Sequence, residues 1–175
     1  MSATTEKRKS QQRIEKLDQP ANSHISRVVA VMSGKGGVGK SSVASLLAAG
    51  LARSGHSVAL LDADVTGPSI PKLFGLQRDP ASLGEQILPQ TTGLGIRVMS
   101  LNLLLEKEDL PVIWRGPLIA GAVKQFWTDV VWGEVDYMVI DLPPGTGDVS
   151  LTVLQSLPVD GVIVEIGRAS WRERV

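Results

Sequence analysis

The chain contains no cysteine among its 175 residues, and its formal net charge at neutral pH is zero. Without cysteine it can form no disulfide, no thiolate metal site and no cysteine-ligated cluster of its own. Because Lys plus Arg (18) balance Asp plus Glu (18), no net positive field attracts nucleic acid or an anionic membrane. We therefore expect neither nucleic acid nor a membrane as a partner.

Long apolar runs are also missing. Nowhere do 18 apolar residues follow one another, and residues 1–19 are polar, without the apolar centre of a signal peptide. This pattern predicts a soluble, cytoplasmic protein. With 43% apolar residues, the chain has enough apolar surface for one packed core and little room for a second domain.

From Val28 onward, short β-branched runs alternate with segments of helical length, which favours the α/β class with a parallel sheet covered by helices on both faces. We expect strands at 28–32, 57–64, 95–101, 135–144 and 161–164, and helices at 41–53, 119–131 and 149–157. Residues 75–94, rich in proline and glycine, are expected to form an irregular excursion.

The two ends of the chain differ in character from this domain, which we place at residues 25–164. Residues 1–24 carry mixed charge without a sustained apolar period, and we expect a flexible tail there. Residues 165–175, EIGRASWRERV, break the apolar pattern with five charges. They can be interpreted as a solvated helix, but the string resembles the in-frame translation of a common sequencing adapter. We expect an artefactual tail and a natural protein that continues past Val164.

A glycine-rich segment, SGKGGVGKSS at 33–42, satisfies the pattern G-x-x-x-x-G-K-S/T between an expected strand and an expected helix. Glycines let successive backbone N–H groups turn inward around phosphate oxygens, and a helix start adds the positive end of its dipole. A plain glycine-rich turn is the alternative interpretation. The residues expected to bind the phosphates of a nucleotide are Gly34, Lys35, Gly36, Gly37, Val38, Gly39, Lys40, Ser41 and Ser42.

Three side chains of this segment have distinct expected roles. Lys40 would neutralise the β- and γ-phosphates, and Ser41 would offer its hydroxyl to Mg²⁺, a hard ion that prefers oxygen ligands. Lys35, in the string KGGVGKS, marks the deviant form of the motif, in which this lysine reaches across a dimer interface to the partner's nucleotide. An exposed loop lysine is the alternative for Lys35.

Aspartates follow two of the expected strands, at the edge where open parallel sheets bind ligands. Asp141 is expected to act as a Walker B aspartate that holds Mg²⁺ through water and accepts from Ser41, and Asp64 to orient the attacking water. Either aspartate could instead cap a helix or form a turn. We assign no role to Asp62 or Asp148. The run PPGTGD at 143–148 is either a switch that senses the γ-phosphate or a rigid turn.

Across Val28–Val164 the chain resembles the Mrp (ApbC-like) family of P-loop ATPases, relatives of the MinD and ParA proteins. The strings SGKGGVGKSS, GPSIP, WRGP and DLPPGTGD carry the resemblance. It implies a P-loop NTPase fold of the SIMIBI or MinD-like kind, incomplete at its C-terminus. It also implies slow, Mg²⁺-dependent ATP hydrolysis by a cytosolic homodimer that accepts iron–sulfur clusters from an assembly scaffold and transfers them to apoproteins.

Carried over by position, the resemblance gives catalytic roles to Lys35, Lys40 and Asp64 and makes Ser41 and Asp141 metal ligands. The family's 4Fe–4S cluster sits on a C-x-x-C pair that this chain lacks, so we expect the cluster only in a full-length parent protein. Two alternatives stay open at this point. One is a ParA- or MinD-like positioning ATPase, and the other is an inert fragment.

Overall fold

A six-stranded sheet runs through the centre of the computed structural model, which describes residues 16–19, 22–64, 69–76, 82–83, 86–101, 116–145 and 147–167. Its order is β5-β6-β2-β7-β1-β8, and every pair is parallel except β5 with β6. The strands are β1 (Ser23–Ser33), β2 (Val58–Asp62), β5 (Gln90–Thr91), β6 (Arg97–Ser100), β7 (Gly133–Asp141) and β8 (Gly161–Glu165). A separate antiparallel pair joins β3 (Ser82–Leu83) and β4 (Gln86–Ile87).

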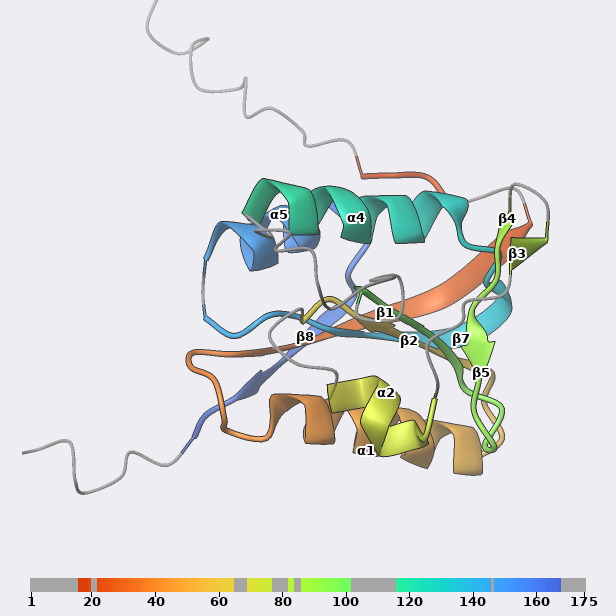
Figure 1. Ribbon diagram of the computed structural model, residues 1–175, viewed down its shortest axis with the longest axis horizontal. Helices are drawn as coiled ribbons and strands as arrows, with labels where there is room; N and C mark the ends of the chain where they lie inside the picture. The colour runs from red at the N-terminus through yellow and green to blue at the C-terminus, as the bar shows by residue number, and fades with distance from the viewer. Residues whose placement is uncertain are drawn as a thin grey trace, which may run out of the picture.

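Helices cover both faces of the sheet (Figure 1). They are α1 (Lys40–Arg53), α2 (Ser69–Phe74), α4 (Gly116–Asp129) and α5 (Asp148–Ser156). In Figure 1, α1 and α2 lie on one side of the sheet and α4 and α5 on the other. The predicted parallel α/β architecture with two helical layers is therefore confirmed. Within the described residues, no helix combines the length and the apolar character needed to cross a bilayer.

The alternation of side chains along buried strands divides the interior into two cores. Met138 and Ile140 on β7 pack into the core on the α4 and α5 side, whereas Val139 between them packs into the core under α1. Leu60 and Leu61 on β2 split in the same way. Successive strand residues point to opposite faces, so a strand buried on both sides must be apolar at consecutive positions. This explains why the sequence shows runs rather than alternation.

The amino-acid composition of residues 40–53 explains why they form helix α1. The segment is rich in alanine and leucine, which form helices well, and Ala44 and Ala48 are fully buried against the sheet. The helix stops where Gly55 adopts a φ of 89°, a left-handed conformation that favours glycine, and donates its N–H to the carbonyl of Ala52 at 3.0 Å. Helix α1 starts at Lys40, within the glycine-rich segment and one residue before the predicted start at 41, and it ends at Arg53 as predicted.

The last residues of the expected flexible tail, residues 1–24, are held against the domain in the structure. Strand β1 begins at Ser23, and Gln19 exchanges two hydrogen bonds with the backbone of Ile25. The indole nitrogen of Trp127 donates to the carbonyls of Leu17 and Asp18 at 3.3 and 3.1 Å. A buried indole N–H needs an acceptor, and this need ties the segment to α4. Residues 1–15 lie outside the described part of the chain.

The structure also differs from the predicted irregular segment at 75–94 and from the predicted start of the C-terminal tail at 165. Residues 75–94 contain the short strands β3, β4 and β5, each of two residues, which are too brief for a sequence pattern to reveal. Glu165, assigned in the sequence to the C-terminal tail, is the last residue of β8 and is aligned with Ser33 of β1. Residues 168–175 lie outside the described part of the chain, as do Trp114 and Arg115 of the WRGP string.

Candidate functional site

The glycine-rich segment connects the end of β1 to the start of α1. Gly37 and Gly39 have φ angles of 75° and 100°, in the left-handed region that side chains with a Cβ rarely adopt. The carbonyl of Gly39 accepts the first helical hydrogen bond, from the N–H of Val43, at 2.9 Å. The glycines at these two positions therefore allow a tight loop immediately before the N-terminus of a helix of fourteen residues.

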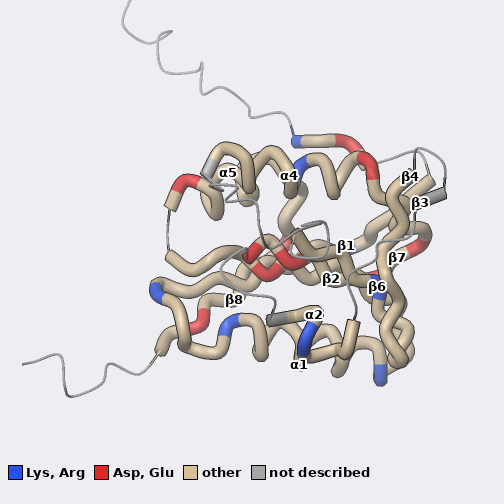
Figure 2. Tube along the Cα trace, viewed as in Figure 1, with Lys and Arg blue, Asp and Glu red and all other residues tan. Residues whose placement is uncertain are grey.

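Strand register brings polar side chains to one edge of the sheet. Asp141 of β7 is aligned with Asp62 of β2 and with Val31 of β1, and Asp62 is aligned in turn with Ser100 of β6. Figure 2 shows the acidic stretches gathered at the middle of the molecule, where β2 and β7 end. The carboxyl ends of these parallel strands therefore meet beside the glycine-rich loop, which follows β1.

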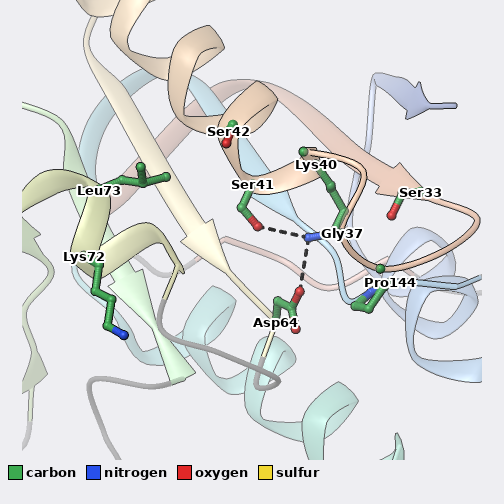
Figure 3. Close-up of a pocket in the computed structure, with 11 residues that line it drawn as sticks. Ser33, Gly37, Lys40, Ser41, Ser42, Asp64, Lys72, Leu73 and Pro144 are labelled. Atoms are coloured by element: carbon green, nitrogen blue, oxygen red, sulfur yellow. Dashed lines mark hydrogen bonds and ion pairs between the residues drawn. The ribbon is translucent and has the colours of Figure 1, made fainter. Parts of the chain in front are cut away.

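Lys40 lies at the centre of this arrangement (Figure 3). Its side chain is only 5% exposed, and its ammonium nitrogen donates to Oδ1 of Asp141 at 2.5 Å. The same nitrogen is 3.4 Å from Oδ2 of Asp64 and 3.4 Å from the hydroxyl of Ser41. One buried cation thus joins residues from the loop, from β7 and from the end of β2.

Asp141 is fully buried, and burial raises the pKa of its carboxyl above the usual value. The positive charge and the hydrogen bond of Lys40 lower the pKa of Asp141, but they only partly offset the effect of burial. Its second oxygen, Oδ2, has no hydrogen-bond partner among the described residues. A buried carboxylate oxygen without a partner is costly unless a cation or water satisfies it. Together with the hydroxyl of Ser41, this oxygen has the hard-donor character that suits Mg²⁺.

Asp62, to which we assign no role from the sequence, supports the backbone of Asp64. Its Oδ1 accepts from the backbone N–H of Asp64 at 3.0 Å, and its Oδ2 accepts from the hydroxyl of Ser100 at 2.8 Å. Burial raises the pKa of Asp62 to about 7, although these two hydrogen bonds lower it and the neighbouring carboxylates of Asp141 and Asp64 add to the rise. Asp62 therefore fixes the backbone from which Asp64 reaches the site.

A pocket of about 550 Å³ opens in front of Lys40, within the size range of small-molecule sites. Its walls come from the glycine-rich loop and α1, from the end of β2, from α2 and from the loop after β7. The lining residues are Ser33, Gly36, Gly37, Gly39, Lys40, Ser41, Ser42, Asp64, Lys72, Leu73 and Pro144. Most of the residues predicted from the sequence therefore share one cavity.

Three predicted loop residues, Gly34, Lys35 and Val38, do not line this pocket. Lys35 is exposed, and its carbonyl accepts from the hydroxyl of Ser33 at 3.0 Å. Val38 lies against Gly167, where there is no space for a Cβ. The predicted roles of these residues remain predictions.

Lys72, Leu73 and Pro144 also line the pocket; of these, only Pro144 lies in a segment singled out from the sequence. Pro144 belongs to the PPGTGD run, where the N–H of the following Gly145 donates to the carbonyl of Ser33 at 2.9 Å. This hydrogen bond ties the loop after β7 to the end of β1, and its glycine-rich sequence was the available signal. For Lys72 and Leu73 the nearby GPSIP string was the only hint.

Asp148, also unassigned from the sequence, lies at the first residue of α5, where a carboxylate interacts favourably with the helix dipole. It is exposed and lines a second, smaller cavity of about 290 Å³ between α4 and α5, together with Lys124. Asp148 therefore lies outside the group of side chains gathered around Lys40.

Comparison with known proteins shows which family the chain resembles. Residues 24–168 match the profile of the ParA-type family described as NUBPL iron-transfer P-loop NTPase. An iron-sulfur cluster carrier protein of Clostridium perfringens is 48% identical over 149 residues, which cover 81% of this chain and 52% of that protein. Its counterpart in Methanocaldococcus jannaschii is 51% identical over 144 residues, covering 81% and 50%. The chain thus spans about half the length of these curated relatives.

Solved structures give the same result. A nucleotide-binding protein of Archaeoglobus fulgidus in complex with ADP has a TM-score of 0.70 and 49% identity, covering 81% of this chain and 54% of that one. Cobyrinic acid a,c-diamide synthase of Mycobacterium smegmatis, with a bound ATP analogue and magnesium, has a TM-score of 0.52 and 26% identity, covering 80% and 59%. The predicted P-loop NTPase fold and the family resemblance are both confirmed, and the chain belongs to the family of iron-transfer P-loop NTPases.

Proposed function

We propose that this chain binds ATP with Mg²⁺ in the pocket in front of Lys40 and hydrolyses it slowly, as the nucleotide-dependent part of a cytoplasmic iron–sulfur cluster carrier. The observation that carries the proposal is the contact of the Lys40 ammonium with Asp141 and Asp64 beside a glycine-rich loop. Support comes from the relatives named as cluster carriers and from the related structure that holds ADP.

The electrostatics of the site favour a triphosphate accompanied by a cation. Lys40 is now shared between two carboxylates, and it can turn toward phosphate oxygens that enter in front of it. Asp141 would then lose its counter-charge and need a new one, because burial disfavours an isolated carboxylate. Ser41 and Asp141 would hold Mg²⁺, which when bound neutralises part of the charge on the phosphates.

Hydrolysis in this proposal uses positioning and charge neutralisation without a covalent intermediate. Lys40 binds the phosphates, and the carboxylate of Asp64, at the pocket wall, orients the attacking water toward the terminal phosphorus. Asp62 keeps Asp64 in place through the hydrogen bond to its backbone N–H. Among the described residues that line the pocket, this carboxylate is a weak base and no stronger one is present, and slow turnover is the expected consequence.

The iron–sulfur cluster is cargo in this proposal, and this chain does not itself provide a fitting site for it. The sequence has no cysteine. Among the residues that the structure describes, no group of three His, Asp or Glu side chains could hold a metal ion either. In this proposal the cluster ligands are residues that this chain does not contain, and transfer from a scaffold to apoproteins belongs to the longer carrier.

Homodimerisation is part of the proposal through Lys35. This lysine is exposed on the loop, does not line its own pocket and forms no ion pair within the described part of the chain. A long cationic side chain in that position can reach a phosphate bound to a second subunit. Nucleotide binding would then favour the dimer, because each nucleotide bridges two chains.

Calorimetry of the chain with ATP tests the proposal. We expect saturable binding with excess Mg²⁺, much weaker binding in EDTA, and slow release of inorganic phosphate in a coupled assay. Absence of Mg²⁺-dependent ATP binding by the folded chain, with folding verified by circular dichroism, would refute the proposed function.

A further inference from the structure

Lys72 is a second cation on the wall of the nucleotide pocket. It belongs to α2 and lines the same cavity as Lys40, Ser41 and Asp64. Its side chain is exposed, and no carboxylate of the described residues forms an ion pair with it. In contrast to Lys40, it therefore has a charge that is available to an incoming anion.

The charge balance of the pocket indicates that a bound triphosphate needs a second cationic side chain. Lys40 already faces the carboxylates of Asp141 and Asp64, and Asp62 lies directly behind them. A triphosphate adds several negative charges to this acidic edge, and a divalent cation offsets only part of them. Anionic groups gathered at one site repel each other strongly unless further cations share the charge. Lys72 is the described basic residue, besides Lys40, that lines the cavity.

The position of α2 indicates which phosphate Lys72 can reach. In Figure 3 the glycine-rich loop and Pro144 form one side of the pocket, α2 with Lys72 and Leu73 forms the other, and Lys40 and Asp64 lie between them. Phosphates bound by the loop and Lys40 would lie on the loop side of this pocket. A phosphate chain that extends across the pocket past Lys40 and Asp64 would approach the wall formed by α2, which carries Lys72.

We propose that Lys72 binds the terminal phosphate of ATP and makes the site discriminate between nucleoside triphosphate and diphosphate. This inference rests on the proposed function, because it concerns the same pocket. Lys72 follows Asp64 by eight positions along the chain. Loss of the terminal phosphate therefore releases α2 near the residue that orients water, and α2 becomes an element that reports the state of the nucleotide.

The test compares two nucleotides on three variants of the chain. Calorimetry with Mg²⁺ measures the Kd of the non-hydrolysable analogue AMP-PNP and of ADP. Lys72→Gln is expected to weaken AMP-PNP binding roughly tenfold, as befits one charge-assisted hydrogen bond, and to change ADP binding by less than about twofold. Lys72→Arg keeps the charge and should retain the preference for AMP-PNP. Lys124→Gln, a matched change on α4, should leave both constants unchanged.

The outcomes separate this inference from the proposed function. If Lys72→Gln weakens both nucleotides equally, or neither, Lys72 does not bind the terminal phosphate and the inference is overturned while nucleotide binding stands. A wild-type chain that binds neither nucleotide overturns both. Because Lys72 is exposed on the surface of α2, its replacement should not disturb folding, and thermal unfolding of the variants checks this point.

Discussion

The ammonium nitrogen of Lys40 and Oδ1 of Asp141 lie 2.5 Å apart, although 101 positions of sequence separate the two residues. Both side chains are buried, so the contact is a desolvated ion pair and not a surface contact of little consequence. The pair joins the helix after β1 to the end of β7. It holds together the two strand ends that the proposed triphosphate site requires.

Replacement of Lys40 by alanine should abolish tight nucleotide binding, with a loss of affinity on the order of a hundredfold or more. It also leaves buried Asp141 without its partner, which costs on the order of 3 kcal/mol of unfolding free energy unless the carboxyl takes up a proton. Calorimetry and urea denaturation measure the two effects. Lys124→Ala serves as the control, and an unchanged Kd for Lys40→Ala would contradict the proposed site.

Replacement of Asp64 by asparagine should leave ATP affinity within a few-fold of the wild type and slow turnover by on the order of a hundredfold. The amide keeps the size of the side chain but cannot accept as a carboxylate does. Steady-state phosphate release and ATP binding are measured on the same preparation, with Asp148→Asn as the matched control. Equal losses of affinity and turnover would show that Asp64 binds ATP rather than orienting water.

Replacement of Asp141 by asparagine should remove the benefit of Mg²⁺. Asparagine retains an oxygen that accepts from Lys40, but it offers no charge to a cation. We expect the wild-type Kd for ATP to fall as Mg²⁺ is titrated in, and that of the variant to respond at much higher concentrations. An identical Mg²⁺ dependence in the two proteins would exclude Asp141 as a metal ligand.

The raised pKa of Asp62 predicts that the stability of the protein depends on pH. Its pKa is about 7 in the folded protein against an ordinary 3.8, so between these values the folded state binds a proton that the unfolded state has released. The contribution of Asp62 to the free energy of unfolding is therefore largest below about pH 4. It declines as the pH rises from about 4 to about 7, by up to about 1.4 kcal/mol per pH unit, and is constant above that range.

The variant Asp62→Asn isolates this contribution. The uncharged amide can still accept from the N–H of Asp64 and, with its own N–H, donate to the hydroxyl of Ser100. Unfolding free energies measured by urea denaturation between pH 4 and 8 should therefore fall less steeply with pH in the variant than in the wild type. Parallel curves for the two proteins would assign the pH dependence to other groups.

Lys35→Ala tests the proposed reach of this lysine into a second subunit. At low protein concentration, where the chain is monomeric, we expect nearly unchanged ATP binding, because Lys35 does not line its own pocket. At higher concentration the wild type should turn over faster per chain as it dimerises, and the variant should lose this increase. Sedimentation with AMP-PNP and Mg²⁺ follows the dimer directly. A variant that dimerises and hydrolyses ATP like the wild type would leave Lys35 without the proposed role.

Local sequence patterns were sufficient to predict the loop, helix and strand nearest the site. The string KGGVGKSS predicts a phosphate loop because left-handed glycines and a helix start are encoded within a few residues, and the structure has them at Gly37, Gly39 and Lys40. The apolar run ending in Asp141 predicts a buried strand for the same reason. Such features depend on neighbours in the chain and need no long-range contact.

Residues that matter through distant contacts were harder to predict. Nothing near Asp62 indicates that its carboxylate accepts from Ser100, 38 positions away, and nothing near Trp127 indicates that its indole binds the carbonyls of Leu17 and Asp18. Lys72 looks like any helical surface lysine until α2 is placed beside the pocket. Side-chain partners of this kind depend on how the strands are ordered, which periodicity does not encode.

The sequence by itself therefore determined the chemistry of the phosphate loop, the two acidic strand ends and the alternation of strands with helices, because each depends on residues close together in the chain. Only the tertiary structure decided that β7 lies between β1 and β2, which brings Asp141 to Lys40 and aligns it with Asp62. The physical reason is that strand order and register follow from burying two apolar faces at once, a condition imposed by the whole core and by no single segment.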